Sequence, residues 1–263
     1  AIYCKAMERA NVDRLSEFQI RKEIFYAGNQ VDERKWYKHF NNSEKAMNWV
    51  IDLMESAGYK VKVEIGTPSE DTDLYHETCS IGWDLGDGMQ ADPDMQLATG
   101  MMQPLLVKEL ARHLTEDLGG EIYFKTKGEQ LVRDSDGAGR VSAVVCSRED
   151  GSFAKYVGKK AVVLATGDFS ANRDMMYAYA PSYAPYISDD VYDGETNYDV
   201  GFQYGGLFKG DGQRMGLWVG AAWQKVFPNC VMGGFYGPGP RNLYSNFLGL
   251  LVNKNGERFM NED

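Results

Sequence analysis

Apolar positions recur at helical spacing in two stretches of the first 60 residues. Residues 12–26 carry them every three or four positions, which predicts a helix. A second helix is predicted after Asn42 and Ser43, which offer an N-cap, and Gly58 stands where a left-handed C-cap would end it. Residues 59–65 alternate between apolar and polar and predict a short strand, whereas the polar, glycine-bearing residues 67–94 predict a long loop.

The middle of the chain predicts a helix followed by strands. Residues 101–118 have helical apolar spacing and end at two glycines, and residues 121–125 predict a strand directly after them. Turn sequences then separate three short β-patterned runs, which predict an antiparallel meander: residues 130–133, 140–147 and 153–157. Alternation of helix and strand is typical of an α/β fold.

Residues 161–165 form an apolar run without alternation, which predicts a parallel strand covered on both faces. A short helix is predicted over 172–179, stopped by Pro181. Further on, the glycine-aspartate-glycine run at 210–212 predicts the start of a helix over 213–222, and residues 247–253 predict a buried strand ending in a turn. The predicted sheet is therefore mixed, with a parallel layer and an antiparallel meander.

Composition narrows the classes of function. The 263 residues hold 28 Lys and Arg against 38 Asp and Glu, a net charge of −10, which argues against nucleic acid as a partner. No apolar run is long enough to predict a membrane span. The cysteines lack metal or disulfide spacing, so four free thiols are expected: Cys4, Cys79, Cys146 and Cys230.

Common catalytic motifs are also missing from the sequence. It contains no GxGxxG, GxxxxGK[ST], HExxH, GxSxG or CxxCH, and its three histidines have no pattern typical of ligands or bases. No metal site is predicted. Two short segments remain as candidates for binding chemistry.

The first candidate is the end of the apolar strand, Ala165-Thr166-Gly167-Asp168, because ligands of open α/β sheets bind beyond the carboxyl ends of strands. A glycine there lets backbone approach a cofactor closely, although Thr166 and Gly167 could equally just end a strand. The second candidate is Asp211, which could cap its helix, the favoured interpretation, or accept hydrogen bonds from a ligand hydroxyl.

Several segments occur together in the order found in one family of flavoproteins: residues 103–106, the helix and strand up to Thr126, the meander, residues 162–172, residues 210–212 and residues 251–262. With them the chain resembles the fumarate reductase and succinate dehydrogenase superfamily, which includes 3-ketosteroid dehydrogenases and urocanate reductase. The match is close from about residue 100 to 263 and loose before that. The resemblance implies a Rossmann-like FAD-binding domain with a capping domain over the flavin.

The resemblance also implies positions for the cofactor. Ala165, Thr166 and Gly167 would face FAD, backbone near Gly128 would lie by its adenine end, and Asp211 would match the aspartate of the family's glycine-aspartate-glycine turn. Asp168 replaces the family's second glycine and brings a side chain near the cofactor.

Two parts of the family's machinery are expected outside these residues. The N-terminal βαβ unit would precede Ala1, and the catalytic arginine of fumarate reduction would follow Asp263, so the chain is expected to be a central fragment that is inactive alone. Residues 1–222 would be a partial FAD-binding domain and residues 223–263 the start of the cap. Either a cytoplasmic or an exported bacterial protein fits, because an export signal would stand at the missing N-terminus.

Departures from the family bear on the substrate. Phe227-Pro228-Asn229 stands where fumarate reductases have His-Pro-Thr, and the glutamate and arginine of the proton path are absent. The resemblance therefore implies hydride transfer between flavin and a C–C bond of a small saturated or unsaturated molecule other than fumarate, with an unidentified electron donor or acceptor. Alternatives are a ketosteroid-type dehydrogenase, with Tyr236 or Tyr244 as base, and a non-catalytic binding module.

Overall fold

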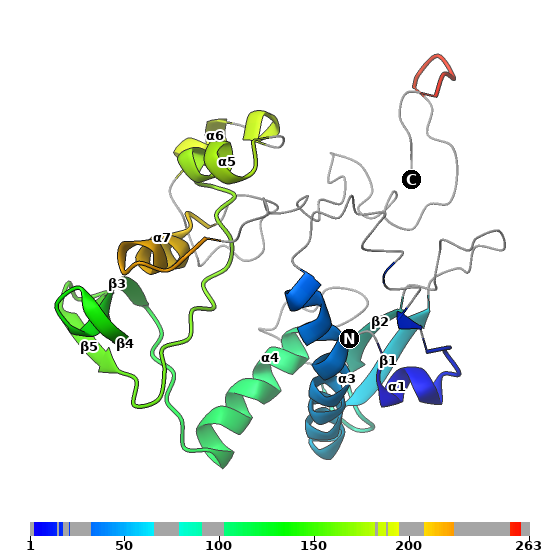
Figure 1. The fold of residues 1–263 in the computed structure, drawn as a ribbon. Coiled ribbons are helices and arrows are strands. Elements are labelled where there is room, and N and C mark those ends of the chain that lie inside the picture. The colour runs from blue at the N-terminus through cyan, green and yellow to red at the C-terminus, as the bar shows by residue number, and fades with distance from the viewer. Residues whose placement is uncertain are drawn as a thin grey trace. The chain divides into compact units, whose positions relative to one another are not determined.

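The computed structural model describes residues 3–14, 16, 17, 21, 33–65, 79–90, 103–181, 184–187, 189–194, 208–223 and 253–258 (Figure 1). The chain divides into two compact units. The first comprises Ala1–Val162 with Trp223–Val226, and the second comprises Val163–Ala222 with Phe227–Asp263. The predicted boundary at residue 222 between a cofactor domain and a cap stays a prediction.

The longest helix of the first unit is α3, Glu33–Ser56, which begins ten residues before the predicted start at Ser43. Asn42 does not cap it, because the Asn42 side-chain nitrogen donates to the Lys38 carbonyl oxygen one turn earlier, at 2.7 Å. The predicted end is confirmed. Gly58 has a φ of +89°, and the amides of Gly58 and Tyr59 donate to the carbonyls of Glu55 and Met54, as in a Schellman cap.

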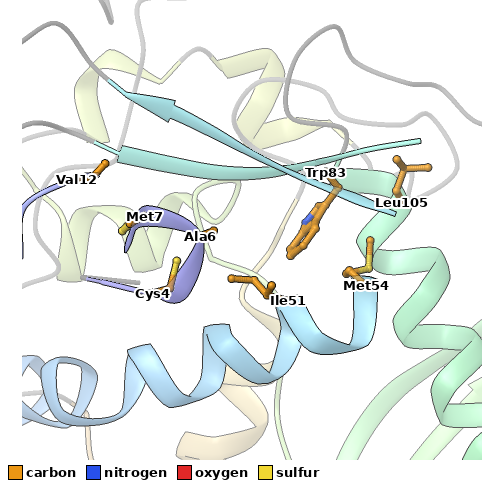
Figure 2. Packing of buried hydrophobic residues seen from close by; sticks show 8 residues of the cluster. All are labelled: Cys4, Ala6, Met7, Val12, Ile51, Met54, Trp83 and Leu105. Atoms are coloured by element: carbon orange, nitrogen blue, oxygen red, sulfur yellow. The ribbon is translucent and has the colours of Figure 1, made fainter. Parts of the chain in front are cut away.

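A small apolar core lies between α1, Lys5–Arg9, the helix α3 and the strand β2, Cys79–Asp84 (Figure 2). Figure 2 shows the Trp83 ring of β2 directed toward Ile51 of α3, and both side chains are buried. The other buried members are Cys4, Ala6, Met7, Val12, Met54 and Leu105. Cys4 and Cys146 are free, buried thiols, as expected, and the side chains of Cys79 and Cys230 lie outside the described residues.

Two strands form an antiparallel ladder in this unit. β1, Lys60–Ile65, confirms the predicted strand, and it pairs with β2, Cys79–Asp84, from Lys60 opposite Asp84 to Ile65 opposite Cys79. The loop predicted over 67–94 is therefore wrong where β2 lies. Polar and glycine residues favour a loop locally, but backbone pairing with β1 supplies hydrogen bonds that the local pattern does not reveal.

The predicted helix over 101–118 appears as α4, Gln103–Arg112, followed by a π-helical turn η1, His113–Asp117. The strand predicted over 121–125 is wrong: these residues are irregular and exposed. The meander is confirmed as an antiparallel sheet in the order β3-β4-β5, with strands Thr126–Ser135, Ala138–Arg148 and Phe153–Val157.

The covered parallel strand predicted over 161–165 is wrong for the structure described. Residues 161–169 have no regular secondary structure, and Val163 and Leu164 are 84% and 41% exposed. An apolar run shows that a segment could be buried in a sheet, but a strand forms only where a neighbouring backbone pairs with it. The two sheets of the described residues consist of β1 and β2, and of β3 to β5.

The second unit contains helices α5, Arg173–Tyr179, α6, Asp189–Asp193, and α7, Asp211–Trp218, with a 3₁₀ turn η2, Ala184–Tyr186. The predicted helix over 172–179 is confirmed. Asn172 caps it, since its side-chain oxygen accepts a hydrogen bond from the Met175 amide at 3.1 Å. Buried side chains of α5, of its C-cap residue, of η2 and of α6 form the core of this unit: Met176, Ala180, Ala184 and Tyr192.

Of the last predicted strand and turn, the structure describes residues 253–258. Asn253 organises the predicted turn there by accepting hydrogen bonds from the amides of Asn255 and Glu257. Residues 247–252 and most of the helix predicted over 12–26 lie outside the described residues. No helix within the described ranges is both long and apolar enough to cross a bilayer.

Candidate functional site

The segment Ala165-Thr166-Gly167-Asp168 is an exposed turn of the second unit. Gly167 has a φ of +75°, a left-handed backbone conformation that residues other than glycine rarely adopt. A Cβ at this position would also lie 2.8 Å from the Phe208 ring. Both the left-handed backbone and the Phe208 contact therefore require glycine at position 167, and residues 165–168 are exposed.

The start of α7 lies directly against this turn. A Cβ on Gly212 would lie 1.9 Å from the Thr166 hydroxyl oxygen and 2.9 Å from the Thr166 Cβ, so only a hydrogen fits between helix and turn. The side-chain nitrogen of Gln213 donates to the Gly167 carbonyl oxygen at 2.9 Å. A close contact and a hydrogen bond thus hold the turn against the first turn of the helix.

Residues 171 and 172, which follow the turn, are hydrogen-bonded to residues 208 and 209, which precede α7. The Ala171 amide donates to the Phe208 carbonyl at 3.0 Å, and the Asn172 side chain donates to the Lys209 carbonyl at 2.8 Å. The Lys209 ammonium group donates to the carbonyls of Ala171, at 3.0 Å, and Tyr192, at 2.7 Å. Burial raises the pKa of the Tyr192 phenol. These hydrogen bonds hold residues 171–172 and residues 208–209 together.

Asp211 is the first residue of α7, and the favoured interpretation of it as the cap is wrong. The N-cap is Gly210, with a φ of +74°, and no side chain caps the helix. The Asp211 carboxylate instead pairs with Arg214 one turn later in the helix. A carboxylate in the first turn still stabilises the helix, because the amides there carry partial positive charge.

The Asp168 carboxylate turns back toward its own chain. One of its oxygens accepts hydrogen bonds from the amide and the hydroxyl of Ser170, both at 2.7 Å. The side chain that replaces the family's glycine is therefore held beside the exposed turn by local bonds.

The remaining predicted site residues lie elsewhere in the chain. Gly128 is in β3 of the first unit, opposite Cys146 and beside the irregularity at Glu129, whose carboxylate accepts from the Ser147 hydroxyl at 2.7 Å. Tyr236 and Tyr244 lie outside the described residues. The second unit thus brings together five of the predicted residues: Ala165, Thr166, Gly167, Asp168 and Asp211.

Gln213 is a site residue that the sequence analysis did not single out. Glutamine at the third position of a helix ordinarily reaches back to the N-cap amide, so the sequence would suggest local capping. Its side-chain oxygen is buried without a hydrogen-bond partner in the described part of the chain. Leaving such a group unpaired costs about 1–3 kcal/mol.

The exposed backbone at 165–168 and the unpaired, buried Gln213 oxygen fit a polar organic ligand such as a flavin dinucleotide. The glycines at 167, 210 and 212 let the Phe208 ring, the Met175 side chain and Thr166 pack closely against the backbone beneath this surface. Among the residues with described positions, no three His, Cys, Asp or Glu side chains are grouped to hold a metal.

Comparison with known proteins decides the family. The profile described as "FAD binding domain" matches residues 87–263, which is most of the chain. The chain belongs to this FAD-binding domain family. The resemblance found in the sequence, the α/β FAD-binding fold and FAD as the family's cofactor are thereby confirmed.

A solved structure supports the fold of this FAD-binding domain. The open conformation of a flavocytochrome c3 fumarate reductase matches with a TM-score of 0.55 and 17% sequence identity. The match covers 84% of this chain and 32% of that chain, so the present sequence spans about a third of the fumarate reductase.

Proposed function

We propose that this chain forms part of an enzyme that transfers hydride between FAD and a C–C bond of a small molecule other than fumarate. The observation that carries the proposal is the exposed turn at 165–168, held against α7 in a chain of the FAD-binding domain family. FAD, when bound, supplies the centre that accepts or donates hydride.

The residues of the chain would bind and orient the cofactor. The backbone at Ala165, Thr166 and Gly167 would approach FAD, because these residues are exposed. Asp211 would accept hydrogen bonds from a cofactor hydroxyl, and backbone near Gly128 would lie at the adenine end. Asp168 would add a carboxylate close to the cofactor.

We propose a substrate other than fumarate because of the sequence around residue 228. Phe227 precedes Pro228 where fumarate reductases have a histidine whose imidazole would contact a dicarboxylate. A bulkier or aromatic substrate fits the loss of that imidazole. Tyr236 and Tyr244 are the candidates for proton transfer if the enzyme acts as a ketosteroid-type dehydrogenase.

The first test is an FAD titration of this 263-residue chain and, in parallel, of the full-length gene product. Bound flavin is followed by its absorbance and by quenching of its fluorescence. We expect the full-length product to bind FAD and the chain alone to bind it weakly. If neither protein binds flavin, the proposed enzymatic function is wrong and a non-catalytic binding module is favoured.

The substrate class is tested with the FAD-loaded full-length product under anaerobic conditions. Reduced flavin is mixed with fumarate, an aromatic enoate and a ketosteroid enone, and its reoxidation is followed by absorbance. We expect faster reoxidation by one of the bulkier compounds than by fumarate. Tyr236→Phe and Tyr244→Phe then test the proton donor, and reoxidation fastest with fumarate would contradict the proposed substrate class.

A further inference from the structure

We infer that Gln213 is a positioning residue for the cofactor: it fixes the Gly167 carbonyl and thereby the backbone of the turn that faces FAD. The inference rests on the proposed function, since it assumes that this turn contacts the cofactor. It assigns a role to a side chain that the sequence pattern alone would interpret as a helix cap.

The hydrogen bond of the Gln213 side chain supports this role. Gln213 stands in the first turn of α7, yet its side chain donates to a carbonyl 46 positions earlier in the chain rather than to its own helix. The acceptor belongs to Gly167, the residue with the left-handed backbone at the centre of the turn. The bond therefore constrains the orientation of the peptide after Gly167, which the glycine by itself leaves free.

The side-chain oxygen of Gln213 is unpaired in the described part of the chain. That atom is buried and has no hydrogen-bond partner among the described residues, so the amide is a poor choice for stability at this position. Methionine has a similar shape and would leave no polar atom unsatisfied. A residue that lowers stability while fixing an exposed turn is typical of a functional site, where local rules of stability are broken.

A cofactor site requires its binding groups to be placed precisely. Binding groups must be held within about 0.5 Å of their productive positions by neighbouring residues. Gly212 sets the distance between helix and turn through its contact with Thr166, but a steric contact does not fix the direction of a carbonyl. The hydrogen bond from Gln213 does so.

Gln213→Met in the full-length product tests the inference. The hydrogen bond and the unpaired oxygen are both removed, so we expect the thermal midpoint of the apo protein to stay unchanged or rise. FAD binding should nevertheless weaken, with a Kd about tenfold higher, equivalent to about 1.4 kcal/mol. Gln213→Glu keeps the oxygen and removes the donor, and should also raise the Kd.

Gln103→Met is the matched control, because the Gln103 side chain also donates to a backbone carbonyl, that of Ile81 at 3.1 Å, in the first unit. It should leave the FAD Kd within twofold of wild type. The same result for Gln213→Met would overturn the inference. So would a Kd increase accompanied by a matching loss of apo stability, which indicates a merely structural role.

Failure of the positioning role and failure of the proposed function give different results. Wild type that binds FAD, together with Gln213 variants that bind it equally well, overturns the positioning role alone. Wild type that fails to bind FAD overturns the proposed function and the positioning role with it. The circular-dichroism signal of bound flavin gives a second readout, and we expect it to change in Gln213→Met but not in Gln103→Met.

Discussion

At position 212 the space between α7 and the turn admits no side chain larger than a hydrogen atom. The Gly212 α-carbon lies so close to Thr166 that an added methyl group would overlap the threonine hydroxyl and approach its Cβ. Thr166 is β-branched and attached to the turn itself, so its side chain has few alternative rotamers. An added methyl group must therefore move the helix or the turn.

Gly212→Ala should destabilise the full-length product by about 1–3 kcal/mol, as overpacking generally does. It should also weaken FAD binding, because the turn at 165–168 moves with Thr166. Urea unfolding and FAD titration measure the two effects.

Gly216→Ala is the control in the same helix. A Cβ there would have ordinary contacts, 3.7 Å to the Ala221 side chain and 3.9 Å to that of Leu164. Since alanine favours helix over glycine by about 1 kcal/mol, this variant should be neutral or stabilising and should bind FAD like wild type. Equal behaviour of the two alanine variants would contradict the steric argument.

At the scale of elements, the junction of α4 and η1 is held by one arginine. The Arg112 guanidinium donates to both oxygens of Asp117, at 2.8 Å each, and to Glu109, which is only 3% exposed. His113 lies 2.8 Å from Asp117 as well. The hydrogen bonds from Arg112 and then from His113 hold the pKa of Asp117 well below its usual range. A lowered folded-state pKa stabilises the fold above the unfolded pKa, and this contribution is lost as the pH falls.

Arg112→Ala should therefore lower the urea midpoint at pH 7, since it removes the partner of Asp117 and leaves the buried Glu109 without its arginine. The difference in urea midpoint between Arg112→Ala and wild type should become smaller below about pH 4, where Asp117 of the unfolded chain becomes protonated. Urea unfolding at pH 7 and pH 3 measures both effects.

Lys125→Ala is the comparison, because Lys125 pairs with Glu149 at 2.7 Å on an open surface. Exposed pairs contribute little, so its urea midpoint should stay close to that of wild type at both pH values. A constant difference between Arg112→Ala and wild type from pH 7 to pH 3 would contradict the role assigned to Asp117.

For the whole molecule, cofactor binding and stability are linked. A ligand that binds the folded state alone stabilises it by mass action, by about 2.7 kcal/mol at a concentration one hundred times its Kd. If the turn at 165–168 belongs to the FAD site, FAD must stabilise the second unit, which contains that turn.

FAD should raise the thermal midpoint of the full-length product, and the increase should grow with the logarithm of its concentration. Riboflavin, which lacks the phosphates and the adenosine, should raise the midpoint less at the same concentration. Thermal unfolding followed by circular dichroism measures this. A midpoint that is independent of FAD up to millimolar concentration would show that the folded product does not hold the cofactor.

Local patterns were sufficient to predict several elements. The left-handed C-cap at Gly58, the short helix predicted over 172–179 and the three strands of the meander follow from residues close together in sequence. Caps, turns and hairpins depend on a few neighbouring residues, so their signals are local. The sequence by itself also determined the FAD-binding family, because its segments carry that pattern in order, and it singled out residues 165–168 as a candidate site.

Tertiary structure decided the rest. The strand β2 and the irregular course of residues 161–165 depend on whether another backbone is present to pair, which no local pattern reports. The role of Gln213 likewise required knowing that Gly167, 46 positions away in sequence, lies beside α7. A hydrogen bond or a strand pairing depends on distance in space, and that distance is fixed only when the chain has folded.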